Sequence, residues 1–233
     1  MSAIPPPPAD AILSALDRDG HAVLPALLDA DACATVAAMF DDGATAFRST
    51  VIMARHGYGQ GEYRYFARPL PDMVQQLRET LYPPLAAVAN VWADRLAGLR
   101  HWPADHTALA AECAAAGQTR PTPLLLRYGP GDHNRLHQDV YGDLVFPLQL
   151  AVLLDAPGRD FEGGEFVLVE GRARMQSRAR VVPLRRGDAV VFPVRDRPVA
   201  SARGWSKAVM RHGVADIRYG QRRTLGIIFH DAR

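Results

Sequence analysis

The second half of the chain consists of short runs rich in Val, Leu, Ile and Phe that recur about every ten residues. Gly, Pro and Asp turns separate these runs, and this spacing is typical of a β-sandwich or jelly roll. Helical patterns come mainly before residue 118, so helices precede the strands instead of alternating with them. This order favours an α+β fold over a parallel α/β fold. The predicted strands are 124–128, 146–155, 165–170, 179–184, 188–194, 205–214 and 222–230.

The N-terminus shows two helices with a short strand between them. Apolar residues spaced three and four apart predict a helix over 9–19, and Gly20 ends it. A strand is expected at 21–25. Asp29 or Asp31 then begins a second helix that runs to about residue 40.

Residues 71–116 are also rich in helical signals. Pro83-Pro84 is expected to divide two helices here, because proline removes a backbone donor. A third helix covers about 104–116. No linker or internal repeat interrupts the chain, so we expect a single domain over 1–233. Its helix-rich part, 1–117, would buttress a sheet-based core of β-sandwich or jelly-roll type at 118–233.

The segment from Met53 to Arg68 has no clean period and contains three glycines and several aromatic residues. Glycine supplies hinges and aromatic rings supply contact area, which favours a functional loop or a lid. A plain surface loop is an equally good interpretation of the same pattern.

The ends of the chain and its cysteines bear on location. No apolar run is long enough to span a bilayer, so no membrane contact is expected. The N-terminus lacks the basic and apolar regions of a signal peptide, and Pro5–Pro8 is expected to form a polyproline II tail. Cys33 and Cys113 lie far apart in the sequence, which is not the pattern of a disulfide framework. A cytoplasmic location follows as the expectation, and the oligomeric state is left open.

Charge is distributed unevenly along the chain. Residues 1–60 hold seven Asp against three Arg, whereas 171–223 hold thirteen Arg and one Lys against three Asp. A solvated basic face is the simplest interpretation. A basic face also attracts anions, among them nucleic acid, an acidic protein or a dicarboxylate co-substrate.

His137 and Asp139 form a possible metal-binding pair. In extended backbone, side chains two residues apart lie on the same face. One imidazole and one carboxylate are two thirds of the 2-His-1-carboxylate group that holds non-heme Fe(II) with open coordination positions. For the third ligand we favour His212, which lies within a predicted strand. His133, on the turn before the pair, and His230, near the end of the chain, are alternatives.

Ten residues after His212, the order Arg222-Arg223-Thr224 suggests a carboxylate site. Strand alternation puts Arg222 and Thr224 on one face, where a guanidinium can bind a carboxylate bidentately and a hydroxyl can add a hydrogen bond. Tyr128 would donate to the same carboxylate. The competing interpretations are a strand arginine in a salt bridge and a core tyrosine.

Four motifs together resemble the Fe(II)/2-oxoglutarate dioxygenases, in particular the prolyl-hydroxylase-like branch. They are HQD at 137–139, FEGGEFVLVE at 161–170, VVPLRRGDAVVF at 181–192 and the spacing from His212 to Arg222. The segments MARHGYGQGEYRYF, GQTRPTPLLLRYGPGDHNRLHQDVYGDLVFPLQL and GIIFHD also resemble a bacterial subfamily described as nucleic-acid oxygenases.

This resemblance implies a double-stranded β-helix (a cupin-like jelly roll) as the catalytic core at 118–233, with Fe(II) at His137, Asp139 and His212. It also implies 2-oxoglutarate at Arg222, to which the residue pattern adds Thr224 and Tyr128. The cofactors expected are Fe(II), 2-oxoglutarate and O2, with ascorbate as an optional addition.

The expected reaction is hydroxylation of a C–H bond with release of succinate and CO2. The substrate is left open among a protein, a small molecule and a nucleic acid, and its selection is expected at 53–68 and 140–146. One alternative is oxidative modification or repair of nucleic-acid bases, with the Arg-rich segment 172–186 tracking the phosphates. A second alternative is a non-catalytic metal-binding jelly roll.

Overall fold

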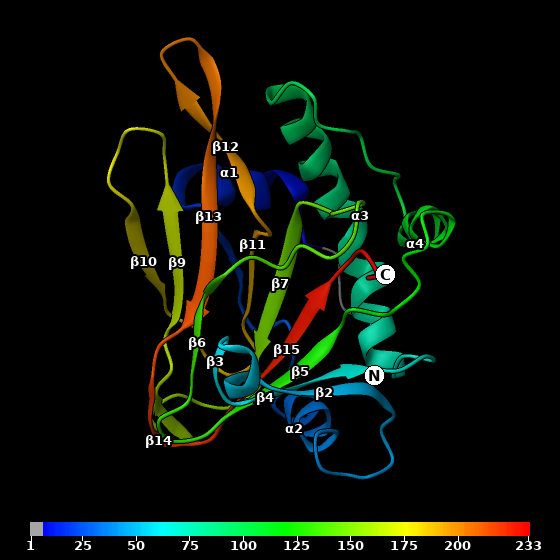
Figure 1. Ribbon diagram of the computed structural model, residues 1–233, viewed down its shortest axis with the longest axis vertical. Helices are drawn as coiled ribbons and strands as arrows, with labels where there is room; N and C mark the ends of the chain where they lie inside the picture. The colour runs from blue at the N-terminus through cyan, green and yellow to red at the C-terminus, as the bar shows by residue number, and fades with distance from the viewer. Residues whose placement is uncertain (1–6) are drawn as a thin grey trace.

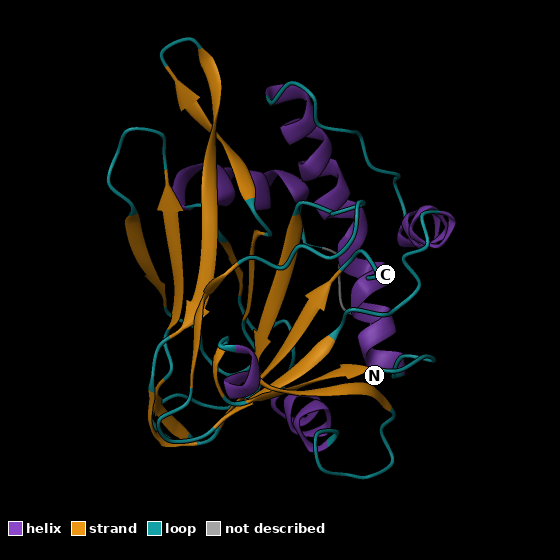
Figure 2. Ribbon diagram, viewed as in Figure 1, coloured by secondary structure: helices purple, strands orange, loops and turns teal. Residues whose placement is uncertain are grey.

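The computed structural model describes residues 7–233, which form two antiparallel β-sheets facing each other and a layer of helices outside one of them (Figures 1 and 2). Every ladder between named strands is antiparallel. This mixed architecture with mostly antiparallel sheets confirms the α+β prediction. The polyproline II prediction for Pro5–Pro8 falls partly outside the described residues.

The larger sheet has seven strands and carries the β15 strand at its centre. Its order is β1-β11-β7-β15-β5-β4-β2. The bounds are β1 (Ala22–Leu24), β2 (Phe47–Ile52), β4 (Glu62–Phe66), β5 (Leu124–Tyr128), β7 (Leu148–Leu153), β11 (Ala189–Pro193) and β15 (Arg222–Ile228). Three of these strands come from the first 117 residues, so the N-terminal half contributes directly to the main sheet.

The smaller sheet has the order β10-β9-β13-β6-β3, with β12 also paired to β13. The bounds are β3 (Gly59–Gln60), β6 (His133–His137), β9 (Phe166–Gly171), β10 (Arg178–Val182), β12 (Asp196–Ser201) and β13 (Gly204–Val214). A separate pair joins β8 (Phe161–Gly163) to β14 (Ile217–Gly220). Each of the seven predicted strand runs overlaps one strand. The strands β2, β3, β4, β8, β12 and β14 and the short polar strand β6 were not predicted.

Among residues 7–233, four α-helices lie on the outer side of the larger sheet (Figure 1). They are α1 (Ala9–Asp19), α2 (Ala30–Ala38), α3 (Asp72–Arg95) and α4 (His106–Ala115). Asp29 caps α2 by accepting a hydrogen bond from the backbone N–H of Ala32, and Gly20 ends α1 with a φ of 76°, as the sequence predicts. Leu225 and Ile227 of β15 point into the same apolar cluster as these helices. The opposite face of the sheet is therefore free to line a cavity.

The predicted break at Pro83-Pro84 is wrong, because α3 runs through both prolines. The two missing N–H groups leave the carbonyls of Glu79 and Thr80 without helical partners. The prolines do not interrupt the buried face, on which Leu81 and Leu85 are each at most 1% exposed. Burial of this continuous apolar face outweighs the cost of two lost hydrogen bonds.

The expectation that 53–68 is a loop is also wrong, because most of the segment has regular secondary structure. The segment contains a 3-10 turn, η1 (Met53–His56), followed by β3 and β4. β3 pairs with β6 of the smaller sheet and β4 with β5 of the larger one, so the segment bridges the two sheets. Its three glycines all have positive φ values, and a Cβ at position 59 would lie 2.3 Å from the carbonyl oxygen of His133.

Among the helices that the structure describes, none is both long and apolar enough to cross a membrane.

Acid should destabilise the fold through His106, which is 5% exposed and donates from Nε2 to the carbonyl of Phe229 at 3.0 Å. Burial lowers the pKa of His106 to about 4. Because an unfolded histidine titrates near 6.5, the unfolded chain binds more protons between these values and stability falls as the pH falls. Titration of His106 alone should lower the free energy of unfolding by about 2 kcal/mol between pH 7.5 and pH 5. Urea unfolding of wild type and His106→Gln at pH 7.5 and pH 5 measures it.

The exposed His101 provides the control for this measurement, since its side chain is 63% exposed. His101→Gln should keep the wild-type loss of stability between the two pH values. A His106→Gln variant with the same loss as wild type would show that His106 is not responsible.

Candidate metal and co-substrate site

His137 and His212 face each other across the pairing of β6 and β13, where they are direct partners in the register. Their ring centroids are 4.1 Å apart. Asp139 follows two residues after His137, just beyond the end of β6. Asp139 thus lies close to the two histidines although it is not in a strand.

The three side chains form a compact donor group. Asp139 Oδ1 lies 3.5 Å from His137 Nε2, and Asp139 Oδ2 lies 3.2 Å from His212 Nε2. One candidate ligand atom from each residue lies within 4.8 Å of the other two. Two imidazole nitrogens and a carboxylate oxygen at this separation are able to hold a first-row metal ion such as Fe(II).

The alternative histidines lie elsewhere. His133 Nδ1 is 3.3 Å from the carboxylate of Asp216. His230 is fully buried, and its Nδ1 accepts a hydrogen bond from the backbone N–H of Phe146 at 3.2 Å. Neither joins the group formed by His137, Asp139 and His212.

The backbone orients the ring of His137. Its Nδ1 lies 2.7 Å from the carbonyl oxygen of Arg135, so in the neutral ring Nδ1 carries the proton and Nε2 has the lone pair that a metal ion would need. On the other side, the rings of Phe166 and Phe192 pack against His212 with centroids 6.0 Å and 4.7 Å away. These contacts fix both rings before any ligand arrives.

The charges of the three groups are coupled. Burial raises the pKa of Asp139, but the adjacent imidazoles of His212 and His137 outweigh it and hold that pKa well below its usual value. Burial lowers the pKa of His212. Burial opposes protonation of His137 as well, yet its hydrogen bond to Asp139 leaves its pKa raised. An ionised carboxylate beside a neutral His212 is the state in which metal ligands bind.

Arg222 is buried on the inner face of the larger sheet, with 2% of its surface exposed. Its Nη1 donates to the hydroxyl of Thr224 at 2.6 Å, as the strand alternation predicts. Among residues 7–233 the guanidinium forms no ion pair, and its buried Nε has no acceptor. A buried charge without a counter-ion is costly, so the site is suited to an anionic ligand.

Tyr128 lies opposite Arg222 in the register of β5 and β15. The guanidinium carbon is 5.8 Å from the centre of its ring, and the phenol accepts a hydrogen bond from the side-chain amide of Asn134 at 3.2 Å. Burial raises the pKa of Tyr128 to about 12, so the hydroxyl keeps its proton and can donate. Tyr128 thus lies on the strand next to that of Arg222.

The donor group and the arginine open into one cavity of about 420 Å³ between the sheets. Met53, Tyr58, Tyr63 and Tyr65 also line it, so the 53–68 segment reaches the cavity despite not being a loop. From 140–146, Tyr141 lines the cavity.

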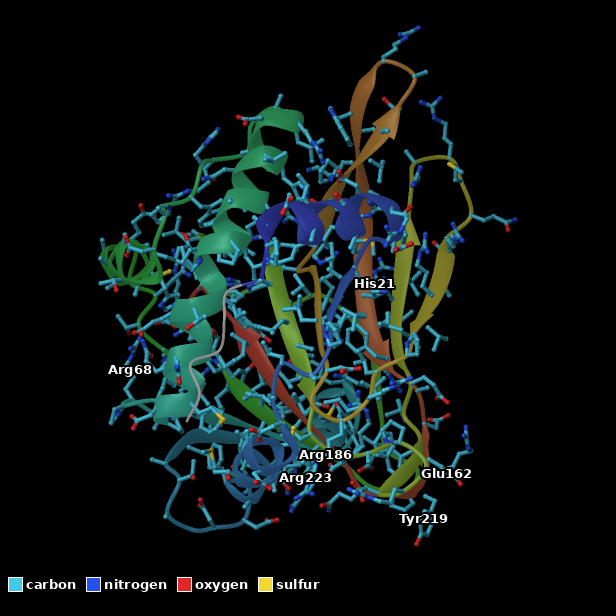
Figure 3. The ribbon with its side chains drawn as sticks, turned by 180° about the vertical axis from the view of Figure 1, so that it is seen from behind. His21, Arg68, Glu162, Arg186, Tyr219 and Arg223 are labelled. Carbon is cyan, nitrogen blue, oxygen red and sulfur yellow. The ribbon has the colours of Figure 1, made fainter. Side chains whose placement is uncertain are left out.

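The next residue of β15 points the other way. Arg223 forms a bidentate pair with Asp155 through Nε at 3.0 Å and Nη2 at 2.6 Å. Figure 3 shows Arg223 and Arg186 beside α2, on the helical side of the sheet. Two adjacent arginines therefore have different environments: Arg223 is neutralised by a carboxylate and Arg222 is not.

Sequence reasoning missed two polar side chains of this site. Asn134 reaches Tyr128, and Tyr141 donates to the carboxylate of Asp139 at 3.0 Å. Tyr141 follows Asp139 by two residues, and this spacing was the available signal. The segment containing it was instead expected to select the substrate.

Comparison with known proteins places the chain in a family. The Oxygenase-NA family, described as an oxygenase catalysing oxidative methylation of damaged DNA, matches residues 61–232. An uncharacterized protein of Mycobacterium tuberculosis strain H37Rv is 48% identical over 167 residues, which are 72% of each chain.

Two solved structures share the fold. A Pseudomonas putida prolyl-4-hydroxylase aligns with a TM-score of 0.54 and 15% identity, covering 97% of this chain and 99% of that one. A 2OG-Fe(II) oxygenase family oxidoreductase from Burkholderia pseudomallei aligns with a TM-score of 0.52 and 17% identity, covering 97% and 93%.

The fold is therefore that of the 2-oxoglutarate/Fe(II) oxygenases, which confirms the resemblance found in the sequence. The chain belongs to the Oxygenase-NA family and is an oxidoreductase.

Replacing Arg222 by methionine should leave the free energy of unfolding unchanged or raise it by about 1–3 kcal/mol, because the change removes a buried charge with no carboxylate partner. Urea unfolding without added metal or 2-oxoglutarate measures this change.

Arg78 gives a matched control, because it is 1% exposed and pairs with Asp231 at 2.8 Å. Arg78→Met should lower the free energy of unfolding by about 3 kcal/mol, since it removes one partner of a buried pair. An equal loss in Arg222→Met would mean that Arg222 is a structural cation instead of a ligand-binding one.

Proposed function

We propose that this chain is an Fe(II)- and 2-oxoglutarate-dependent dioxygenase that hydroxylates a C–H bond of its substrate, with release of succinate and CO2. The observation that carries the proposal is the pairing of two features in one cavity. Arg222, a buried arginine with no counter-ion among residues 7–233, faces the same space as the His-Asp-His donor group. The first needs an anion and the second needs a metal, and 2-oxoglutarate binds to both.

In this proposal His137, Asp139 and His212 hold Fe(II). Their nitrogen and oxygen donors fit this ion and leave its remaining positions open for other ligands. When bound, Fe(II) with 2-oxoglutarate and O2 supplies the oxidising chemistry. The protein orients the reactants and limits the access of water, for which the rings of Phe166 and Phe192 beside His212 are suited.

Arg222, Thr224 and Tyr128 would bind the far carboxylate of 2-oxoglutarate. A guanidinium binds a carboxylate in a charge-assisted, bidentate way that a lysine does not reproduce. The Thr224 hydroxyl already holds Arg222 at 2.6 Å. The phenol of Tyr128 retains its proton and can donate to a second oxygen of the carboxylate.

We also propose that residues 1–233 act as one catalytic domain in which the helical layer is a buttress. β1, β2 and β4 join the larger sheet, and the helices pack against the back of β15. This packing would keep β15 in place while its inner face binds ligands.

Substrate selection is proposed at the segment 53–68. Tyr58 is 51% exposed and lines the cavity, so it stands where an entering substrate would pass. Tyr63 and Tyr65 lie deeper, with their rings in a T-shaped contact at 5.4 Å. These rings give a wall suited to a flat or apolar group.

Oxidation of nucleic-acid bases is the second candidate, and the description of the family favours it. Near the cavity, Arg135 is exposed and could meet a phosphate while Tyr58 stacks on a base. The 172–186 segment contributes no residue to the cavity wall, and two of its arginines already lie near carboxylates: Arg172 pairs with Glu170 at 2.7 Å and Arg180 lies 3.8 Å from Asp19. Arg135 is therefore the better candidate for a phosphate contact.

The metal ligands can be tested without knowing the substrate. Under anaerobic conditions the wild type with Fe(II) and 2-oxoglutarate should develop a weak visible charge-transfer band. Asp139→Ala and His212→Ala should lose both this band and succinate production in air with ascorbate present, while the fold survives. Arg222→Ala should chiefly raise the 2-oxoglutarate concentration needed.

His133→Ala is the control, because His133 lies outside the donor group and should keep the band. Full succinate production by Asp139→Ala or His212→Ala would show that the proposed ligands are wrong. Metal binding by the wild type without a band would favour a non-catalytic metal-binding protein.

Salt dependence separates the nucleic-acid candidate from the others. If nucleic acid is the substrate, binding of a single-stranded oligonucleotide should weaken steeply as salt rises. Protein binding releases the cations condensed on the phosphates, and added salt makes that release less favourable. Arg135→Gln should reduce both the affinity and the salt slope, and Arg174→Gln in the 172–186 segment serves as the comparison. Absence of salt-dependent binding would argue for a protein or small-molecule substrate.

A further inference from the structure

Asp139 is hydrogen-bonded by a tyrosine that lies within the same cavity. The Tyr141 hydroxyl donates to Asp139 Oδ1 at 3.0 Å. The Tyr65 hydroxyl in turn donates to the Tyr141 hydroxyl, also at 3.0 Å. The two rings meet edge to face, with centroids 6.4 Å apart. Each hydroxyl has one proton, so the two hydroxyl groups in series both donate in the direction of the carboxylate.

The backbone that carries Tyr141 is held by a buried glutamine from a distant part of the chain. Gln118 is fully buried, and its Nε2 donates to the carbonyls of Tyr141 at 3.2 Å and Leu144 at 3.0 Å. Its Oε1 accepts from the backbone N–H groups of Asp143 at 2.9 Å and Leu144 at 2.8 Å. One side chain thus fixes the turn at both of its ends.

Gly142 is the residue that lets the turn approach Gln118 so closely. Its φ is 84°, and a Cβ at this position would lie 2.5 Å from the side-chain amide carbon of Gln118. A residue with a side chain would therefore push the turn away. The position of Tyr141 is thus set by packing and hydrogen bonds that exist before any ligand binds.

We propose that Tyr141 is a positioning residue that orients the Asp139 carboxylate for metal binding, and that Tyr65 and Gln118 hold Tyr141 in place. The inference rests on the proposed function, since Asp139 is a metal ligand only there. Tyr141 occupies Oδ1 and leaves Oδ2, which faces His212 Nε2 at 3.2 Å. A carboxylate with one oxygen held in this way presents the other oxygen without having to be reoriented.

Substrate selection is the competing role for Tyr141, because its ring lines the cavity. A purely structural role is another. Neither depends on the hydroxyl reaching Asp139, so removing that hydroxyl alone would leave metal affinity intact in both cases. Metal affinity therefore distinguishes the positioning role from the other two.

The test measures Mn(II) binding to the whole protein by electron paramagnetic resonance in three Tyr→Phe variants. Tyr141→Phe should raise the Mn(II) Kd by about 10- to 100-fold, the usual effect of losing a partner that orients a metal ligand. Tyr65→Phe should raise it less, because Tyr141 still reaches Asp139. Tyr63→Phe should change it least, because Tyr63 lines the same cavity and contacts Tyr65 but has no hydrogen bond to Asp139 or Tyr141.

A second readout guards against a loss of fold. The anaerobic Fe(II) and 2-oxoglutarate band should weaken or shift in Tyr141→Phe, while circular dichroism and the urea midpoint stay close to wild type. A wild-type Mn(II) Kd in Tyr141→Phe, or an equal loss in Tyr63→Phe, would overturn the inference. If the wild type binds no Mn(II), the proposed function itself fails and the inference fails with it.

Discussion

The candidate site depends on the register between β6 and β13, which makes His137 and His212 direct partners. Side chains alternate between the two faces of a strand, so a slip of one residue would turn one histidine to solvent. Burial along β13 fixes this register. Met210 and His212 are buried, and Arg211 between them is exposed. The apolar contacts that close the two sheets together therefore also assemble the donor group.

Of the three buried arginines among residues 7–233, Arg78 and Arg197 pair with carboxylates, whereas Arg222 in the site does not. Arg78 and Arg222 are both almost completely buried, yet Arg78 pairs with Asp231 and donates to the carbonyl of Phe229. Arg223, next to Arg222, binds Asp155 with two hydrogen bonds. A buried guanidinium without a carboxylate partner lowers the stability of the ligand-free protein. The same imbalance would favour a dicarboxylate when it binds, because the ligand supplies the missing charge.

Much of this arrangement was predictable because it follows from local patterns. The alternation along 222–228 predicted that Arg222 and Thr224 share a face, and the turn residues after Gly117 predicted the strands. β6 was missed because its residues are polar, and it forms a strand only through pairing with β13 and β3. Pro83-Pro84 misled for a similar reason. Tertiary burial on either side of the prolines keeps α3 continuous, and no local rule contains that information.

Tyr141 shows where the limit of such prediction lies. Its spacing from Asp139 was visible, but a spacing of two residues implies a shared face only in a strand, and these residues lie beyond the end of β6. The turn acquires its shape from Gln118, more than twenty residues earlier in the sequence, and from a glycine that makes room for it. The geometry of the His-Asp-His donor group is thus prepared in two ways. Sheet register places the histidines, and a buried side-chain amide outside the sheets places the hydroxyl that holds the carboxylate.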